Sequence, residues 1–282
     1  MDVGEAVSVG MIFDEDWTCP FPHDVTIPPA DNVLEGEGGK LGTRMKNGTG
    51  TGTRSDSSYL TAAANPVQDV GKVEVDGTEY ELTQAAHHLI PAQESLKDCP
   101  ILDYIDKDKG AKILKENLGY DVNGSHNGIW LPGPYAVDGW GAMTLEQEDM
   151  PDTATQAKTI AKRQAALPGK LAGEKFQGNY SMGAMELCHT QFHDRHVDYS
   201  NFVRQYLEKI HVNMMMVEAM YCDKCKNRGD EKLPPPPGLV ARLNSLSKKM
   251  AGYLVWPPRS WREPLYTSAW SVNMRAADRP GN

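Results

Sequence analysis

Alternating apolar and polar positions predict a β-hairpin in the first third of the chain, with Asp76–Gly77 as its turn. The alternating apolar residues are Val73, Val75, Tyr80 and Leu82. His87 and His88 follow this hairpin, and we expect them at the end of a strand, where the chain leaves the sheet. Neighbouring side chains of an extended chain point to opposite sides, so one imidazole can bind a metal while the other faces a substrate.

Apolar residues at helical spacing predict several helices. The pattern is strongest over residues 183–210, and residues 239–253 form a last amphipathic helix. Residues 106–119 are also predicted to be helical, with an aspartate at the start and Gly119 at the end. Residues 143–166 are polar and are predicted to be largely helical.

Two histidines lie within the strongest predicted helix. His193 and His196 are three residues apart, so they share one face of a helix. His189 and His193 are four apart and can also share a face. Tyr199 lies on the same helix, and we expect it to pack in the core rather than to react.

Composition divides the chain at about residue 65. Residues 1–65 are expected to be an irregular segment, in which residues 35–58 form a linker or a long loop, too rich in Gly, Thr and Ser to bury a core. Residues 66–282 form the main domain, with a helical insertion at 133–182 and a helical extension at 211–282. The predicted fold class is α+β and mostly helical.

Charge is distributed unevenly along the chain, whose formal net charge is −9. Residues 1–150 contain 10 Lys and Arg against 26 Asp and Glu, whereas residues 151–282 contain 19 against 12. A phosphate backbone would dock against the basic half, because cationic side chains release its condensed counterions. An ordinary fluctuation in charge is the competing interpretation.

The basic half offers several candidate substrate-binding cations. Lys158, Lys162 and Arg163 lie in the insertion, and Arg195 lies beside the histidines. A solvated helix face explains the first three equally well. The C-terminal tail interleaves tryptophans with arginines, which can stack on bases and bind nucleic acid, but packing of the tail is the alternative that we favour.

The five cysteines are an odd number and are scattered, so they indicate a reducing compartment rather than a disulfide framework. Cys222 and Cys225 form a single C-x-x-C pair, which needs two further ligands to hold a structural zinc ion. The candidates for those ligands are Cys19, His23, Cys99 and Cys188. A plain pair of thiols is the alternative.

Three segments, in this order, carry a resemblance to a known family. They are Ala86–Pro91 (AHHLIP), Asn127–Pro132 (NGIWLP) and His196–Tyr199 (HVDY). A histidine pair, an asparagine before an apolar strand and later histidines resemble the HNH, or ββα-metal, nucleases. More narrowly, they resemble the AHH branch, which occurs as toxin modules of bacterial polymorphic and secreted effectors. The resemblance covers about residues 73–210 and implies a small ββα-metal nuclease core embedded in the helical domain.

The resemblance implies a role for each residue of the motif. His87 matches a metal ligand, and His88 matches the general base that deprotonates water. Asn127 matches the residue that pins the loop carrying the base. His193 and His196 match the ligands that complete the site of one divalent metal ion, for which Zn, Mg, Mn and Ni are all candidates.

The third segment departs from the family pattern, in which the two helical histidines are commonly four residues apart. Phe192 lies four residues before His196, so the ligand pair is either His193 with His196 or His196 with another group. We adopt His193 with His196 and keep His189 and His126 in reserve.

The expected function is metal-dependent endonucleolytic cleavage of phosphodiester bonds, with DNA as the expected substrate and RNA as the alternative. The resemblance implies a toxic effector domain, a cognate immunity protein as partner, and action in the cytoplasm of a target cell. The N-terminus indicates no secretory signal peptide, and no apolar run is long enough to span a bilayer. The alternative is a zinc-stabilised structural or adaptor module, whose closed site would use every histidine, His88 included.

Overall fold

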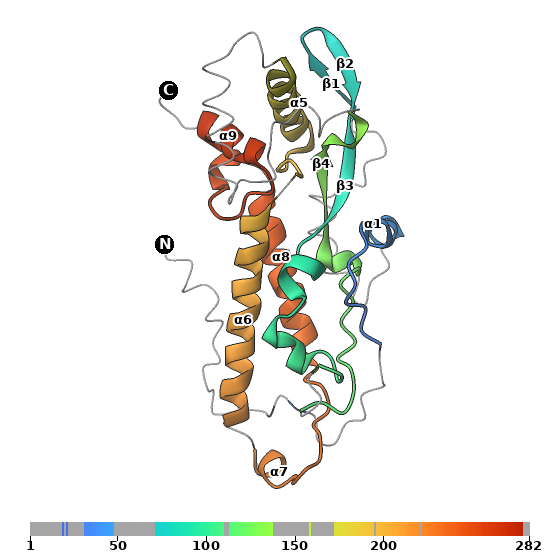
Figure 1. Ribbon diagram of the computed structural model, residues 1–282, viewed down its shortest axis with the longest axis vertical. Coiled ribbons are helices and arrows are strands. Elements are labelled where there is room, and N and C mark those ends of the chain that lie inside the picture. The colour runs from blue at the N-terminus through green and yellow to red at the C-terminus, as the bar shows by residue number, and fades with distance from the viewer. Residues whose placement is uncertain are drawn as a thin grey trace.

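The computed structural model of the protein describes most of the chain, with gaps. The described residues are 19, 21, 31–47, 71–109, 113–137, 158, 172–194, 196–219 and 222–278. Helices and small antiparallel sheets are both present, so the predicted α+β class is confirmed. In Figure 1 the strands lie towards one end of an elongated molecule, and the longest helices run along its length.

The first strand pair is a tight hairpin. β1 (Lys72–Val75) pairs antiparallel with β2 (Thr78–Glu81), and the turn residues Asp76 and Gly77 have φ angles of +49° and +80°. Two central residues with positive φ match the right-handed twist of the strands, and glycine adopts such angles without steric cost. The predicted hairpin is therefore confirmed.

The second strand pair brings the first two segments of the motif together in space. β3 (Thr83–His88) pairs antiparallel with β4 (Gly128–Gly133), in a register that sets His88 opposite Gly128. The histidine pair forms the last two residues of β3, as predicted. Every residue of β4 is buried, which is consistent with helices packing against both β3 and β4.

Six helices and five shorter helical turns are described. The helices are α1 (Gly38–Asn47), α5 (Ala172–Cys188), α6 (Val197–Ala219), α7 (Asp223–Lys226), α8 (Gly238–Leu254) and α9 (Ala269–Ala277). The shorter turns are η1 (Ala92–Leu96), η2 (Pro100–Tyr104), η3 (Ser125–Asn127), η4 (Pro134–Ala136) and η6 (Pro258–Ser260). No described helix is both long and apolar enough to cross a membrane.

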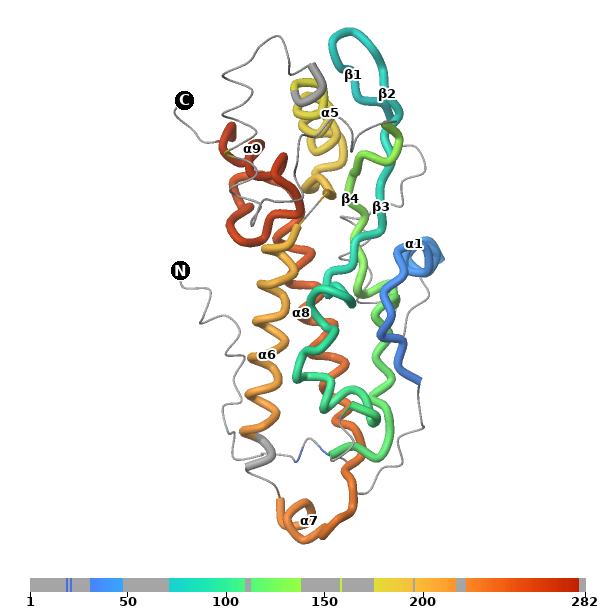
Figure 2. Tube along the Cα trace, viewed as in Figure 1, coloured from blue at the N-terminus to red at the C-terminus, as the bar shows by residue number. Residues whose placement is uncertain are grey.

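Two apolar clusters hold these elements together. The larger one joins α6 and α8 with η1, η2 and β4, and Tyr199 belongs to it with no exposed surface. The smaller one joins β1 and α5 with α9 and contains Trp261 and Trp270. Figure 2 shows α6 and α8 as the long members of the molecule, with α5 and α9 beyond one end of α6. The burial of Trp261 and Trp270 indicates that they pack in the protein rather than stack on bases.

The prediction of one helix over residues 183–210 is wrong. α5 ends at Cys188, α6 begins at Val197, and His189 between them has a φ of +52°. The intervening backbone turns away from helical bonding because it finds partners elsewhere, such as the carbonyl of Leu254, which accepts the N–H of Gln191 at 2.8 Å. His193 and His196 therefore do not lie on one helical face.

The predicted helix over residues 106–119 is also wrong within the described part of that range. Leu114 forms a β-bridge with Leu233, and the N–H of Leu118 donates to the carbonyl of Ile105. The carboxylate of Asp106 accepts the N–H of Asp108 at 2.8 Å and closes a turn instead of capping a helix. Long-range pairing of the backbone has overridden the local apolar spacing.

The predicted linker at residues 35–58 contains a helix, α1. Leu41 has no exposed surface, and Gly42 lies against Trp130 closely enough that a Cβ there would be 3.2 Å from the indole ring. Small residues thus allow α1 to approach the strand pair, which offsets their poor helix propensity. Residues 48–58 of this range lie outside the described residues.

Candidate metal centre

Three histidines from two distant segments meet beside the end of β3. The ring centroids of His87 and His193 are 5.0 Å apart, those of His87 and His196 are 4.8 Å apart, and those of His193 and His196 are 5.4 Å apart. One nitrogen from each ring lies within 4.8 Å of those of the others. These are the three residues that the resemblance selects as metal ligands.

The chemistry of this cluster fits a divalent metal ion. Nε2 of His87 is buried and has no hydrogen-bond partner among the described residues, a state that costs free energy unless a partner is present. Nδ1 of His193 lies 2.9 Å from the hydroxyl of Tyr135, and Nδ1 of His196 lies 3.3 Å from that of Ser200. Outer partners of this kind orient ligand imidazoles and leave Nε2 of both rings for a metal.

Burial lowers the pKa values of all three rings. For His87 burial is the largest cause, and His196 and His193 add to it. Burial, with the neighbouring His196, lowers the pKa of His193 to about 3. Burial also lowers the pKa of His196, although the charge of Glu94 opposes the shift. The rings are therefore neutral near pH 7, which is the form that binds a metal.

The turn after β3 is held by Asn127. Its Oδ1 accepts the N–H of Ile90 at 2.8 Å, and its Nδ2 donates to the carbonyls of Ile90 at 3.1 Å and Val122 at 2.9 Å. The hydroxyl of Ser247 on α8 donates to the same Oδ1 at 2.8 Å. Asn127 thus fixes the backbone two residues beyond His88, which is the contact that the resemblance leads us to expect.

The segment that carries the other two histidines is fastened to the C-terminal part of the chain. Nε2 of Gln191 donates to the carbonyls of Tyr253 and Leu265, both at 3.1 Å. Oε1 of the same side chain accepts the N–H of Thr267 at 2.9 Å. The N–H of His193 donates to the carbonyl of Pro132 in β4 at 2.7 Å. These bonds hold the segment extended across the end of the strand pair.

His88 faces the same pocket as the cluster but has a different partner. Its Nε2 lies 3.0 Å from Oδ1 of Asn123. The same oxygen accepts the N–H of Glu37 at 2.8 Å, while Nδ2 of Asn123 donates to the carbonyl of Glu35 at 2.8 Å. The amide orientation is therefore fixed, Nε2 of His88 must carry the proton, and Nδ1 keeps its lone pair.

A pocket of about 280 Å³ connects His88 with the three-histidine cluster. Glu94 from η1 also lines it, and Gly36 and Gly38 approach from the segment that opens α1. A second pocket, of about 540 Å³, shares Gly38 and His193 with the first and extends along α1. The candidate centre is therefore open on one side rather than closed.

Three residues of the centre were not found from the sequence. Asn123, Glu94 and Tyr135 are ordinary polar residues outside the motif, and no spacing singles them out. Asn123 lies four residues before Asn127, and Tyr135 follows β4 by two residues, so only the strand pairing reveals that both lie beside the histidines.

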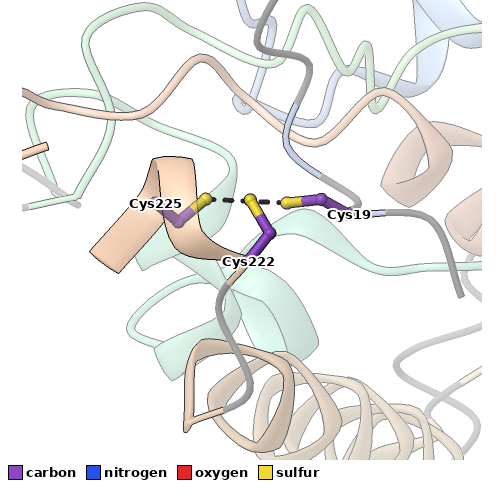
Figure 3. Close-up of side chains that lie close together, drawn as sticks. All are labelled: Cys19, Cys222 and Cys225. Carbon is purple, nitrogen blue, oxygen red and sulfur yellow. Dashed lines mark hydrogen bonds between the residues drawn. The ribbon is translucent and has the colours of Figure 1, made fainter. Parts of the chain in front are cut away.

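The two reserve histidines lie away from the centre, and the other predicted residues are exposed, lie at a second cluster or fall outside the described part of the chain. His126 is buried near Tyr120, and His189 lies against Trp256, so neither belongs to the cluster. Lys158 is exposed. Lys162, Arg163, Arg195 and His23 lie outside the described residues. Cys222 and Cys225 lie at α7 together with Cys19, as Figure 3 shows.

A scan against models of known protein families finds no match for this chain, and neither the search of curated proteins nor that of solved structures finds a similar protein.

Proposed function

We propose that this protein is a metal-dependent nuclease of the HNH type that hydrolyses phosphodiester bonds. One observation carries the proposal: three neutral imidazoles converge on one point, and His88, which is not among them, faces the same pocket. A closed structural site would use all four histidines, whereas a catalytic site keeps a position open and a base free. The division of the four histidines supports the catalytic interpretation.

The rings of His87, His193 and His196 would hold the ion through their Nε2 atoms. A divalent ion at this place supplies charge that neutralises the phosphate and stabilises the leaving oxygen. Tyr135 and Ser200 keep the outer rings in position, and burial keeps His87 neutral. Nitrogen donors of this kind suit Zn or Ni better than Mn or Mg.

His88 performs the proton transfer. Its Nδ1 accepts a proton from water as the water oxygen forms a bond to phosphorus, and the P–O bond to the leaving oxygen breaks. The products are a phosphate monoester and an alcohol, whose oxygen takes its proton from solvent. Asn123 holds the ring in the required tautomer, as an aspartate does in a Ser–His–Asp triad.

A nucleic acid backbone suits the surface beside the centre. Lys46 on α1 is exposed and lies 5.8 Å from the centroid of the Trp130 ring, at the edge of the larger pocket. A cation there can contact a phosphate neighbouring the one that is cleaved. We propose DNA as the substrate, with RNA as the alternative, since both present the same phosphodiester group.

The biological role that follows is that of a toxic effector domain delivered into a target cell. Uncontrolled hydrolysis of nucleic acid endangers the producing cell, so a cognate immunity protein is the expected partner. This role rests on the resemblance of the AHHLIP, NGIWLP and HVDY segments.

A cleavage assay tests the proposal. Purified protein is incubated with supercoiled plasmid DNA or with RNA, with Zn, Ni, Mn or Mg or with EDTA. We expect metal-dependent nicking that His88→Ala abolishes. His189→Asn is the matched control, because asparagine tolerates the positive φ of that residue and the ring lies outside the cluster. Metal binding without cleavage of either polymer would instead indicate a structural module.

A further inference from the structure

A second potential metal site lies at the other end of α6. Cys19, Cys222 and Cys225 place their sulfur atoms within 4.8 Å of one another, and Sγ of Cys19 lies 3.5 Å from Sγ of Cys225 (Figure 3). α6 has 23 residues, which at 1.5 Å per residue is roughly 35 Å. The cysteine cluster and the histidine cluster are thus well separated, since His196 precedes α6 and Cys222 follows it.

We propose that Cys19, Cys222 and Cys225 are three ligands of a structural zinc ion. Zn–S bonds of about 2.3 Å put the ligand sulfurs of a tetrahedral site about 3.8 Å apart, close to the separation of Cys19 and Cys225. Thiolates are the soft donors that select zinc over magnesium or manganese. The C-x-x-C pair supplies two of them from the start of α7, and a segment 203 residues earlier supplies the third.

The segment that carries Cys222 and Cys225 has few buried residues to hold it in place. Between residues 222 and 232, Cys225 alone is buried, so this stretch of the connection from α6 to α8 has little apolar packing of its own. Phe21, two residues after Cys19, is 1% exposed within the larger apolar cluster, and Cys19 itself packs against that cluster. An ion shared by these segments would tie the beginning of the chain to the connection between α6 and α8.

Metal analysis of the full chain tests this site separately from the histidine centre. The protein is purified with a reductant and without chelators, given excess zinc, and freed of loosely bound metal by gel filtration. Cys19→Ser and Cys222→Ser should each lose one zinc per chain relative to wild type. Cys222→Ser combined with His193→Ala should hold one zinc fewer than His193→Ala alone, and the matched cysteine control Cys99→Ser should keep the wild-type content.

Cobalt substitution gives a readout that needs no variant to fold. Co²⁺ bound by three thiolates shows an intense sulfur-to-metal charge-transfer absorption, which imidazole ligands do not produce. We expect this band in wild type and in His193→Ala. Its absence from the wild type, equal zinc content in Cys222→Ser and Cys99→Ser, or a disulfide within the trio in reduced protein would each overturn the proposal.

Discussion

Oδ1 of Asn123 accepts a hydrogen bond from Nε2 of His88 at 3.0 Å and the backbone N–H of Glu37 at 2.8 Å. The amide oxygen of Asn123 is thus a fixed acceptor, and substitutions of Asn123 can either raise or lower the pKa of His88. Burial lowers the pKa of His88, while the bond to Asn123 and the charge of Glu94 oppose that shift.

Substitutions of Asn123 should move the pH dependence of cleavage. Asn123→Asp places a negative charge beside the ring and raises the pKa of His88, so the acidic limb of the rate profile moves to higher pH. Asn123→Ala removes the bond, and the limb moves to lower pH. Cleavage rates measured from pH 5 to 8 at saturating metal test this prediction. Shifts of the acidic limb in the same direction for both variants would contradict the role of Asn123.

Loss of the base should separate chemistry from metal binding. His88→Ala should lower the cleavage rate by about 10²–10⁴-fold or more, while its affinity for the metal, measured by calorimetry, stays close to that of wild type. His193→Ala and His196→Ala should lower both quantities. Near-normal cleavage by His88→Ala would remove it as the base.

The partner of a ligand ring should tune metal affinity. Tyr135→Phe removes the hydroxyl 2.9 Å from Nδ1 of His193 but keeps the aromatic ring. Outer partners of metal-bound histidines typically contribute 10–100-fold to affinity, and we expect about 10-fold because Tyr135 is 62% exposed. An unchanged calorimetric affinity would show that the hydroxyl does not orient His193.

Acid should destabilise the metal-free protein. The pKa of His87 is far below the ordinary value, so the unfolded chain binds more protons and the free energy of unfolding falls as pH drops below about 6.5. One proton contributes at most about 1.4 kcal/mol per pH unit. In urea titrations with EDTA at pH 7, 6 and 5, His87→Gln should flatten this dependence. A variant with the wild-type slope would mean that His87 is not buried in its neutral form.

Removal of Asn127 should be costly for stability. Asn127→Ala leaves the buried N–H of Ile90 and the carbonyls of Ile90 and Val122 without this partner, at about 1–3 kcal/mol for each unsatisfied group. We expect a total loss of about 3 kcal/mol or more in chemical denaturation. Ser247→Ala removes only one bond to the same side chain and should cost about 1 kcal/mol. Equal losses would argue against a central role for Asn127.

Salt dependence of binding should identify the cations that contact the backbone. Short duplex DNA is titrated with inactive His88→Ala protein at several salt concentrations. Adding Lys46→Ala should reduce the slope of log K against log salt by roughly one unit. Neutralising Lys158, Lys162 and Arg163 together provides the comparison, and a change only in that variant would move the binding surface to the insertion.

The sequence predicts those parts of the site that depend on local pattern. The hairpin and the strand ending at His88 follow from two-residue alternation and the Asp76–Gly77 turn, and both are confirmed. The break between α5 and α6 could not be foreseen, because its cause is bonding of Gln191 to residues 62 to 76 positions later. The role of Asn123 could not be predicted for a related reason, because its amide is oriented by backbone groups 86 and 88 residues earlier.

The attachment of Gln191 also limits how this protein can be divided. The motif ends near residue 210. The segment that holds His193 and His196 is nevertheless hydrogen-bonded, through the Gln191 side chain, to the carbonyls of Tyr253 and Leu265 and to the N–H of Thr267. A fragment ending at residue 210 would contain every proposed ligand without the scaffold that presents them. The proposed nuclease unit therefore cannot be cut at its motif boundaries, and transplantation into another protein requires the chain up to at least Thr267.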